Sequence, residues 1–327
     1  MNLFRTEIHP SESDFKIDYN TAVLLVGSCF AQNIGQKLMN FGFNTSINPF
    51  GVLYNPVSVL NGLNILVTGK VYTENDLIYY NDIWQSFDHY TGFSHKNKEE
   101  CLRRINTEIE RSAKFINNIN YLILTFGTSW VYKYKNNGKV VANCHKIPAS
   151  YFERVFIKSE EIVKIYTRFI KEIRKNLPDL KVVFTVSPVR HWKDGATGNM
   201  VSKSNLIMAV HQLVNELPET SYFPSYEIML DDLRDYRFYK DDMIHPSDMA
   251  INYIWEKFIY VYINKETKFL MKEIYKINQV AGHIPSDIHD ENYQKLISSN
   301  IEKAWNLQQK YGIDLNLIIQ ELKSKLT

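Results

Sequence analysis

Two short segments near opposite ends of the chain carry residue types that can catalyse acyl transfer. Ser28 and Cys29 follow the apolar run of residues 22–26, and either side chain could attack a carbonyl carbon. His245, late in the chain, is a base that could accept the proton of that nucleophile. Asp242 precedes it by three residues, a spacing that allows a hydrogen bond to fix the orientation of the imidazole. This pattern indicates an enzyme that acts on ester or acyl groups.

Each half of the pattern also has a plainer interpretation. A free cysteine such as Cys29 is often only a small buried residue. An Asp-x-x-His spacing is frequent by chance, and Asp241 competes with Asp242 for the orienting role. Gly27 favours the functional interpretation, because a glycine after a strand permits a tight turn into a helix. A side chain at that turn meets free backbone N–H groups and the positive end of the helix dipole, which stabilise a thiolate or an oxyanion.

Short apolar runs alternate with longer amphipathic stretches over the first 260 residues. Three runs rich in Val, Leu and Ile predict buried strands, at residues 22–26, 121–126 and 181–186. Apolar residues at helical spacing predict helices at residues 31–41, 98–115, 159–176 and 248–260. Strand and helix alternating in this way predict a doubly wound parallel α/β sheet.

Polar or small residues follow each predicted strand. In a doubly wound sheet, functional residues gather beyond the carboxyl ends of the strands, although strand ends also favour turn residues for purely local reasons. Gly127 follows the second strand, and Arg190 and His191 follow the third. A cation there could bind a carboxylate or phosphate of the substrate, or it could form a structural ion pair. Ser202 and Lys203 are expected to be a helix cap and a surface charge.

Composition excludes several classes of protein. With 38 basic and 36 acidic residues in 327, no strong field favours nucleic acid or an anionic membrane. The 21 Tyr and 18 Phe residues could stack on sugars, but filling a core is their commoner use. Three cysteines form no disulfide framework, and zinc-site spacings are absent from the sequence. Neither a signal peptide nor a membrane span is predicted, so a cytoplasmic location is expected.

The character of the chain changes near residue 265. Helical patterns rich in Lys, Glu, Asn and Gln occupy residues 266–276, 290–311 and 314–326. We therefore predict a main domain over residues 1–265 and a helical extension over residues 266–327. The extension is expected either to pack on the main domain or to mediate homo-oligomer formation.

The pentapeptide Gly27-Ser28-Cys29-Phe30-Ala31 resembles the signature of the GSCFA family, which is named for those letters. Five further stretches resemble that family too: residues 48–51, 127–130, 143–146, 187–191 and 236–246. The similarity covers roughly residues 4–260. The family resembles the SGNH, or GDSL-like, hydrolases. It thereby implies a flavodoxin-like three-layer α/β/α fold and ester hydrolysis or acyl transfer, often on acylated carbohydrates or lipids.

The resemblance assigns positions to the nucleophile and the base. In the Gly-Asp-Ser block of the larger group, the third residue is the nucleophile, which falls on Cys29 here. Ser28 stands where aspartate is usual, so Ser28 and Cys29 remain alternative nucleophiles. The block that supplies the base matches Asp242-Met243-Ile244-His245.

An oxyanion hole is implied as well. Gly51 would donate its backbone N–H to it. The block that usually reads Gly-x-Asn-Asp resembles Gly127-Thr128-Ser129-Trp130, so Ser129 stands in place of the asparagine and Gly127 borders the substrate. A hydroxyl donates with less reach than an amide, and Asn143 could supply the missing donor.

These features predict an acyl esterase or O-acyltransferase that forms a covalent acyl-enzyme on an acylated small molecule or carbohydrate. No cofactor, metal, nucleic acid or membrane partner is expected. The departures at Ser28, Cys29 and Ser129 favour one alternative, a catalytically weakened fold that serves as a carbohydrate-binding or scaffold module. A nucleotide-binding protein is a weaker third hypothesis, because the sequence has neither a dinucleotide-binding glycine pattern nor a P-loop.

Overall fold

A five-stranded parallel sheet forms the centre of the molecule. The computed structural model describes residues 6–283, 285 and 287–326. The strands are β1 (Val23–Gly27), β2 (Thr45–Ile47), β5 (Tyr121–Phe126), β9 (Lys181–Val186) and β10 (Thr220–Phe223), in the spatial order β10-β9-β5-β1-β2. In chain order this is 2-1-3-4-5, the flavodoxin-like order. Winding reverses between β1 and β5, so the crevice expected for a ligand lies beyond their carboxyl ends.

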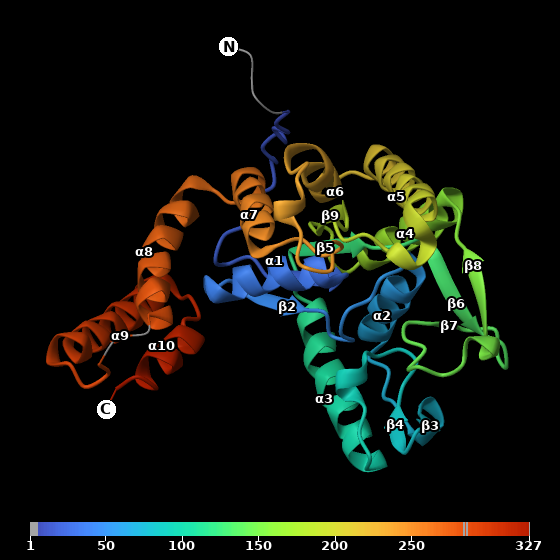
Figure 1. The fold of residues 1–327 in the computed structure, drawn as a ribbon, viewed down its shortest axis with the longest axis horizontal. Helices are drawn as coiled ribbons and strands as arrows, with labels where there is room; N and C mark the ends of the chain where they lie inside the picture. Colours follow the sequence, from blue (N-terminus) through green and yellow to red (C-terminus); the bar gives the residue numbers. More distant parts are fainter. Residues whose placement is uncertain (1–5, 284, 286, 327) are drawn as a thin grey trace.

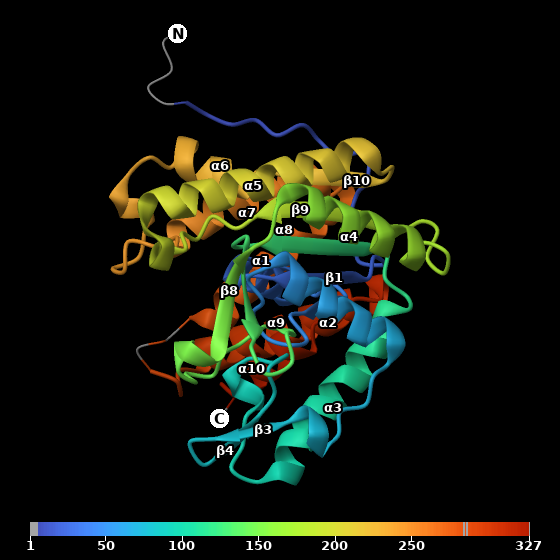
Figure 2. The same cartoon turned by 90° about the vertical axis from the view of Figure 1, so that its right-hand side faces the viewer.

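Helices cover both faces of this sheet, which confirms the predicted three-layer fold (Figures 1 and 2). Successive strand residues point to opposite faces, so Leu24 joins one hydrophobic core and Leu25 joins the other. One core packs α2 (Pro56–Thr68), α4 (Ser159–Ile173) and α5 (Gly195–Glu216). The other packs α1 (Cys29–Asn40) and α7 (Asp248–Tyr262). α3 (Lys98–Ile116) packs on α2.

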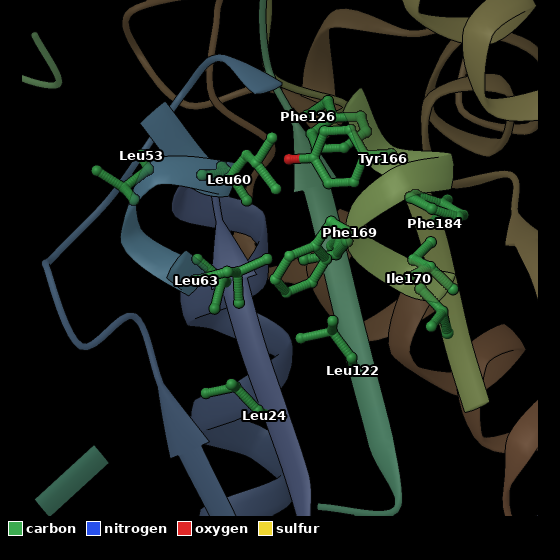
Figure 3. Packing of buried hydrophobic residues seen from close by; sticks show 14 of the residues in the cluster. Leu24, Leu53, Leu60, Leu63, Leu122, Phe126, Tyr166, Phe169, Ile170 and Phe184 are labelled. Carbon is green, nitrogen blue, oxygen red and sulfur yellow. The ribbon is translucent and has the colours of Figure 1, made fainter. Parts of the chain in front are cut away.

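The larger core is built of leucine, isoleucine and aromatic side chains (Figure 3). Tyr166 of α4 lies between Phe126 of β5 and Phe184 of β9, with ring centroids 5.1 and 6.1 Å away. Its hydroxyl donates to the carbonyl of Pro56 at 2.7 Å, so the one polar atom of this buried ring has a partner. The tyrosine therefore fixes the start of α2 against α4.

The predicted strands and helices of the main sheet domain are confirmed to within a few residues. Ser159 is the first residue of α4, and Lys158 is the residue before it. The Ser159 N–H donates to the Asn205 side chain at 2.9 Å, so a neighbouring helix satisfies this end of α4.

Helix α2 was not predicted, and neither were several short elements. These are β2, β10, α6 (Ser225–Glu227), a hairpin of β3 (Ile78–Tyr80) and β4 (Ile83–Gln85), and an antiparallel arm of β6 (Trp130–Tyr134), β7 (Val140–Val141) and β8 (Phe152–Phe156). The arm leaves the sheet at the end of β5, where β6 begins after a three-residue connection. It therefore places aromatic side chains beside the crevice.

Three helices follow the main sheet domain: α8 (Lys265–Gly282), α9 (Glu291–Tyr311) and α10 (Asn316–Lys323), drawn in orange to red in Figure 1. They enclose their own hydrophobic cluster, against which Tyr19 and Phe41 pack. The predicted boundary at residue 265 and the role of these helices in self-association stay predictions. In the described ranges, no helix combines the length and apolarity that crossing a membrane requires.

Candidate active site

Ser28 and Cys29 occupy the turn from β1 into α1, and the two side chains have different surroundings. Ser28 is the N-cap of α1, and its hydroxyl accepts from the Phe30 N–H at 3.2 Å. Its side chain is buried, with 1% of the residue exposed. Cys29 is the first residue of α1 and is partly exposed. The thiol is thus the accessible nucleophile candidate, and the helix leaves the Cys29 N–H without an intrahelical acceptor.

Tyr54 joins this turn to the end of β5, and sequence reasoning missed it. Its hydroxyl lies 3.9 Å from the Cys29 sulfur. Its carbonyl accepts from the N–H groups of Gly127 at 2.7 Å and Thr128 at 3.0 Å. Burial, and then the neighbouring thiol, raise the pKa of Tyr54 to about 12, so the hydroxyl keeps its proton near neutral pH. In the sequence, Tyr54 only precedes Asn55 and Pro56, which cap and begin α2. No motif there indicates that Tyr54 takes part in chemistry.

Asp242 and His245 form the predicted pair. His245 Nδ1 lies 2.6 Å from Asp242 Oδ2, and the other carboxylate oxygen accepts from the His245 and Ile244 N–H groups at 2.9 Å. These two backbone bonds, followed by the imidazole, lower the pKa of Asp242 to about 2. A hydrogen bond to an ionised carboxylate requires Nδ1 to carry a proton, so Nε2 is the acceptor in the neutral form of this imidazole. Asp242, rather than Asp241, therefore orients the imidazole of His245.

The loop that carries His245 approaches the end of β9. Tyr239 bridges to Pro246 across this loop, and Tyr239 and Met243 line a hollow of about 210 Å³ together with Arg190. No hydrogen bond joins His245 to Ser28 or Cys29 within the described residues. The structure therefore forms the Asp–His pair, but it does not bring His245 into contact with either nucleophile candidate.

Two of the predicted oxyanion-hole donors already have partners. The Gly51 N–H donates to the Asn48 carbonyl at 2.7 Å. Ser129 is fully buried, and its hydroxyl donates to the Ser202 carbonyl at 2.9 Å. Asn143 lines a cavity, with its amide 3.4 Å from the Thr91 hydroxyl. The roles of these three residues stay predictions, and Gly51 and Ser129 would each have to exchange a partner to bind an oxyanion.

A cavity of about 450 Å³ opens beside Tyr54, within the size range of small-molecule sites. Four aromatic rings line it, those of Tyr54, Tyr90, Trp130 and Tyr132. Asn55, Thr91, Thr128 and Asn143 add amide and hydroxyl groups. No Asp, Glu, Lys or Arg is among the described residues that form its wall. The cavity thus suits a neutral ligand with apolar faces and hydrogen-bonding edges.

His191 also lines this cavity, whereas Arg190 faces the neighbouring hollow. His191 Nδ1 lies 3.2 Å from a carboxylate oxygen of Asp194, which is also paired with Arg154. Burial lowers the pKa of His191 although Asp194 opposes the shift, so this imidazole is neutral at pH 7. The Nε of Arg190 is buried without a partner in the described part of the chain. His191 and Arg190 are adjacent in the sequence, but they line two different pockets near the carboxyl end of β9.

A family comparison matches residues 22–258 to the model described as the GSCFA family. The chain belongs to the GSCFA family. A comparison with curated proteins finds no match. Among solved structures, this GSCFA chain is similar to a family two carbohydrate esterase from Clostridium thermocellum in complex with cellohexaose. That similarity has 17% identity and a TM-score of 0.24, and it covers 43% of this chain and 34% of the esterase chain. The match thus spans about a third of that esterase.

The expectations for Ser202 and Lys203 were wrong, because both are buried within α5. Ser202 Oγ accepts from the Ser129 N–H at 2.8 Å. Lys203 Nζ donates to the Ser187 carbonyl at 2.7 Å, and burial lowers the pKa of Lys203 to about 7. The two residues therefore fix the segments that follow β5 and β9. Two glycines and a threonine between residues 195 and 198 are weak helix formers and hid the true start of α5.

Two buried histidines support the loops around the cavity. His89 and His145 both contact Ser86, through its hydroxyl at 3.0 Å and its carbonyl at 2.7 Å. Burial, with a contribution from Lys70, lowers the pKa of His89 to about 3, and burial also lowers that of His145. Both side chains are therefore harder to protonate in the folded chain than in the unfolded chain.

Acid is expected to destabilise the protein through these histidines. Their pKa values are lower in the folded chain, so the unfolded chain binds more protons below about pH 6.5. The contribution of these histidines to the free energy of unfolding is therefore fully present above that pH. As the pH falls toward 3, the His89 contribution should decrease by up to ~1.4 kcal/mol per pH unit. Urea unfolding at pH 7.5, 6.5 and 5.5 tests this. His89→Gln should flatten the pH dependence, whereas His9→Gln, at an exposed position, should leave it as steep as in the wild type.

Proposed function

We propose that this protein hydrolyses or transfers acyl esters through a thioester on Cys29. The observation that carries the proposal is the position of Cys29, a partly exposed thiol at the N-terminus of α1 and at the switch point of the sheet. A helix N-terminus favours a thiolate and a developing oxyanion. His245, already oriented by Asp242, supplies a base with an available Nε2.

The reaction requires the His245 loop to close on Cys29. Nε2 then takes the thiol proton while sulfur bonds to the ester carbonyl carbon. The tetrahedral oxyanion, facing the Cys29 N–H, collapses and expels the alkoxide, which takes the proton from His245. Water or an acceptor hydroxyl attacks the thioester, gives its proton to His245, and releases the thiolate, which recovers that proton. Hydrolysis and transfer share these steps and differ only in the acceptor.

The aromatic cavity supports an acylated carbohydrate as the substrate. Sugar rings present C–H faces that stack on aromatic side chains, and their hydroxyls bond to neutral amides and hydroxyls. Tyr54 belongs both to the cavity wall and to the surroundings of Cys29. A sugar held in the cavity would therefore carry its ester toward the thiol.

A second candidate is a carbohydrate-binding module that has lost catalysis. The observation that favours it is the missing hydrogen bond between His245 and Cys29 in the described chain. In such a module the same cavity would bind the sugar, and Cys29 would be an unreactive thiol. The two candidates therefore differ in the chemistry of one sulfur atom.

Alkylation at pH 7 distinguishes them. We expect iodoacetamide to modify Cys29 at least about tenfold faster than Cys144, because a helix N-terminus and an approaching imidazole favour the thiolate. Peptide mass spectrometry over a time course gives both rates in one sample, with buried Cys101 as an internal reference. His245→Ala should slow the labelling of Cys29 alone. A Cys29 rate no higher than that of Cys144 would favour the binding module.

A further inference from the structure

The Tyr54 hydroxyl approaches the Cys29 sulfur from outside the helix that carries the thiol. The 3.9 Å separation is within reach of a hydrogen bond to sulfur, and either atom of the neutral pair can donate. Once the thiol ionises, only the tyrosine has a proton to give. The phenol keeps that proton near neutral pH because a tyrosine ordinarily has a pKa of about 10. Partial burial, in a residue that is 44% exposed, and then the thiol raise the pKa of Tyr54 further.

The backbone around Tyr54 is held on three sides. Its carbonyl accepts from Gly127 and Thr128, and the preceding Leu53 N–H donates to the Gly27 carbonyl at 2.9 Å. On the other side, the Asn55 side chain caps α2 by accepting from the Ser58 N–H at 2.8 Å. Tyr54 is therefore anchored to the ends of β1 and β5 and to the start of α2. A side chain carried on a backbone that is held in this way needs less reorganisation during a reaction than one on a mobile loop.

A tyrosine donor would complete an oxyanion site whose expected donors are engaged elsewhere. The Gly51 N–H and the Ser129 hydroxyl bond to backbone carbonyls. The Cys29 N–H, at the start of α1, is a donor that the turn itself supplies. The Tyr54 hydroxyl lies 3.9 Å from the same sulfur, and Tyr54 also lines the cavity. A carbonyl carbon bonded to that sulfur would place its oxygen near both groups.

We infer that Tyr54 is a catalytic residue that donates a hydrogen bond to the Cys29 thiolate and then to the carbonyl oxygen of the bound ester. This inference rests on the proposed function. The tyrosine keeps its proton throughout, so the proton balance between Cys29 and His245 is unchanged. Its ring has a separate role, because it forms part of the wall of the aromatic cavity.

Two substitutions separate the hydroxyl from the ring. Tyr54→Phe removes only the hydroxyl and should lower kcat for an aryl acetate about 10- to 100-fold with KM unchanged. Tyr54→Leu removes the ring as well and should also raise KM. Tyr275→Phe, at an exposed position on α8, is the matched control and should keep wild-type kinetics. Thermal unfolding of each variant shows whether the fold is retained.

The thiol provides a readout that does not depend on ester turnover. In a Cys144→Ala background, Tyr54→Phe should slow alkylation of Cys29 at pH 7 about three- to tenfold. Unchanged labelling and unchanged kcat in Tyr54→Phe would overturn this inference while the proposed function stands. Slower labelling in a protein that turns over no ester would overturn the proposed function and support the bond from Tyr54 to the thiolate.

Discussion

Replacing Cys29 by alanine should abolish turnover of a short-chain aryl ester, with kcat lower by at least about 10³-fold. In the proposed mechanism, the Cys29 sulfur is the only protein atom that bonds to the acyl group, so no other side chain can replace it. His245→Ala should cause a loss of similar size, because the base acts on the same proton. Since the two residues act as a unit, the double variant should be no slower than either single variant. Initial rates at saturating ester, with active protein confirmed by unfolding curves, measure all three.

Ser28→Ala decides which residue is the nucleophile. If Cys29 is the nucleophile, Ser28→Ala removes only a helix cap and keeps most of the turnover. The loss of the cap should lower the stability by about 1 kcal/mol. The opposite result, with activity in Cys29→Ala but none in Ser28→Ala, would transfer the role to the serine. His9→Ala serves as the histidine control, because the His9 side chain is 71% exposed. Full activity in both Cys29→Ala and His245→Ala would remove the mechanism.

The parts of the site that the sequence predicts are local. Asp242 and His245 are three residues apart, so one turn of chain brings them together without help from the rest of the fold. Cys29 follows a strand that its apolar run predicts, and such strands end at a common edge of the sheet. These inferences need only periodicity and short spacings. The contact between Cys29 and His245 needs the packing of whole elements, and it is not formed in this structure.

The parts that were not predicted depend on long-range contacts. Tyr54 reaches Cys29 across 25 residues and is held by amides from another strand. A lysine is usually exposed, so its residue type predicts that Lys203 lies on the surface. It is instead buried, and its hydrogen-bond partner is a carbonyl 16 residues earlier. Ser129 looks available as a donor until α5 packs against it. A single sequence gives the types of these groups but not which of their hydrogen bonds are already made.

All the residues close to Cys29 depend on one tight approach between neighbouring strands. Gly27 has φ +147°, and the Ser28 N–H donates to the Thr125 carbonyl of β5 at 3.2 Å. A Cβ atom on Gly27 would lie 2.2 Å from that carbonyl oxygen, much closer than two such atoms can approach. The oxygen belongs to the backbone of a central strand and cannot turn aside as a flexible side chain would. Glycine is therefore required where β1 passes into α1.

Gly27→Ala should consequently destabilise the protein by more than about 4 kcal/mol, the range associated with severe steric conflict in a core. Relief of the clash would require β1 to move away from β5, which would separate Cys29 from Tyr54. Gly138→Ala is the matched control, because that glycine also has a left-handed φ, +68°, but has open space at its Cβ position. Conformation alone should cost the control about 1–2 kcal/mol. Urea unfolding of both variants compares the two costs, and equal losses would contradict a steric limit at the end of β1.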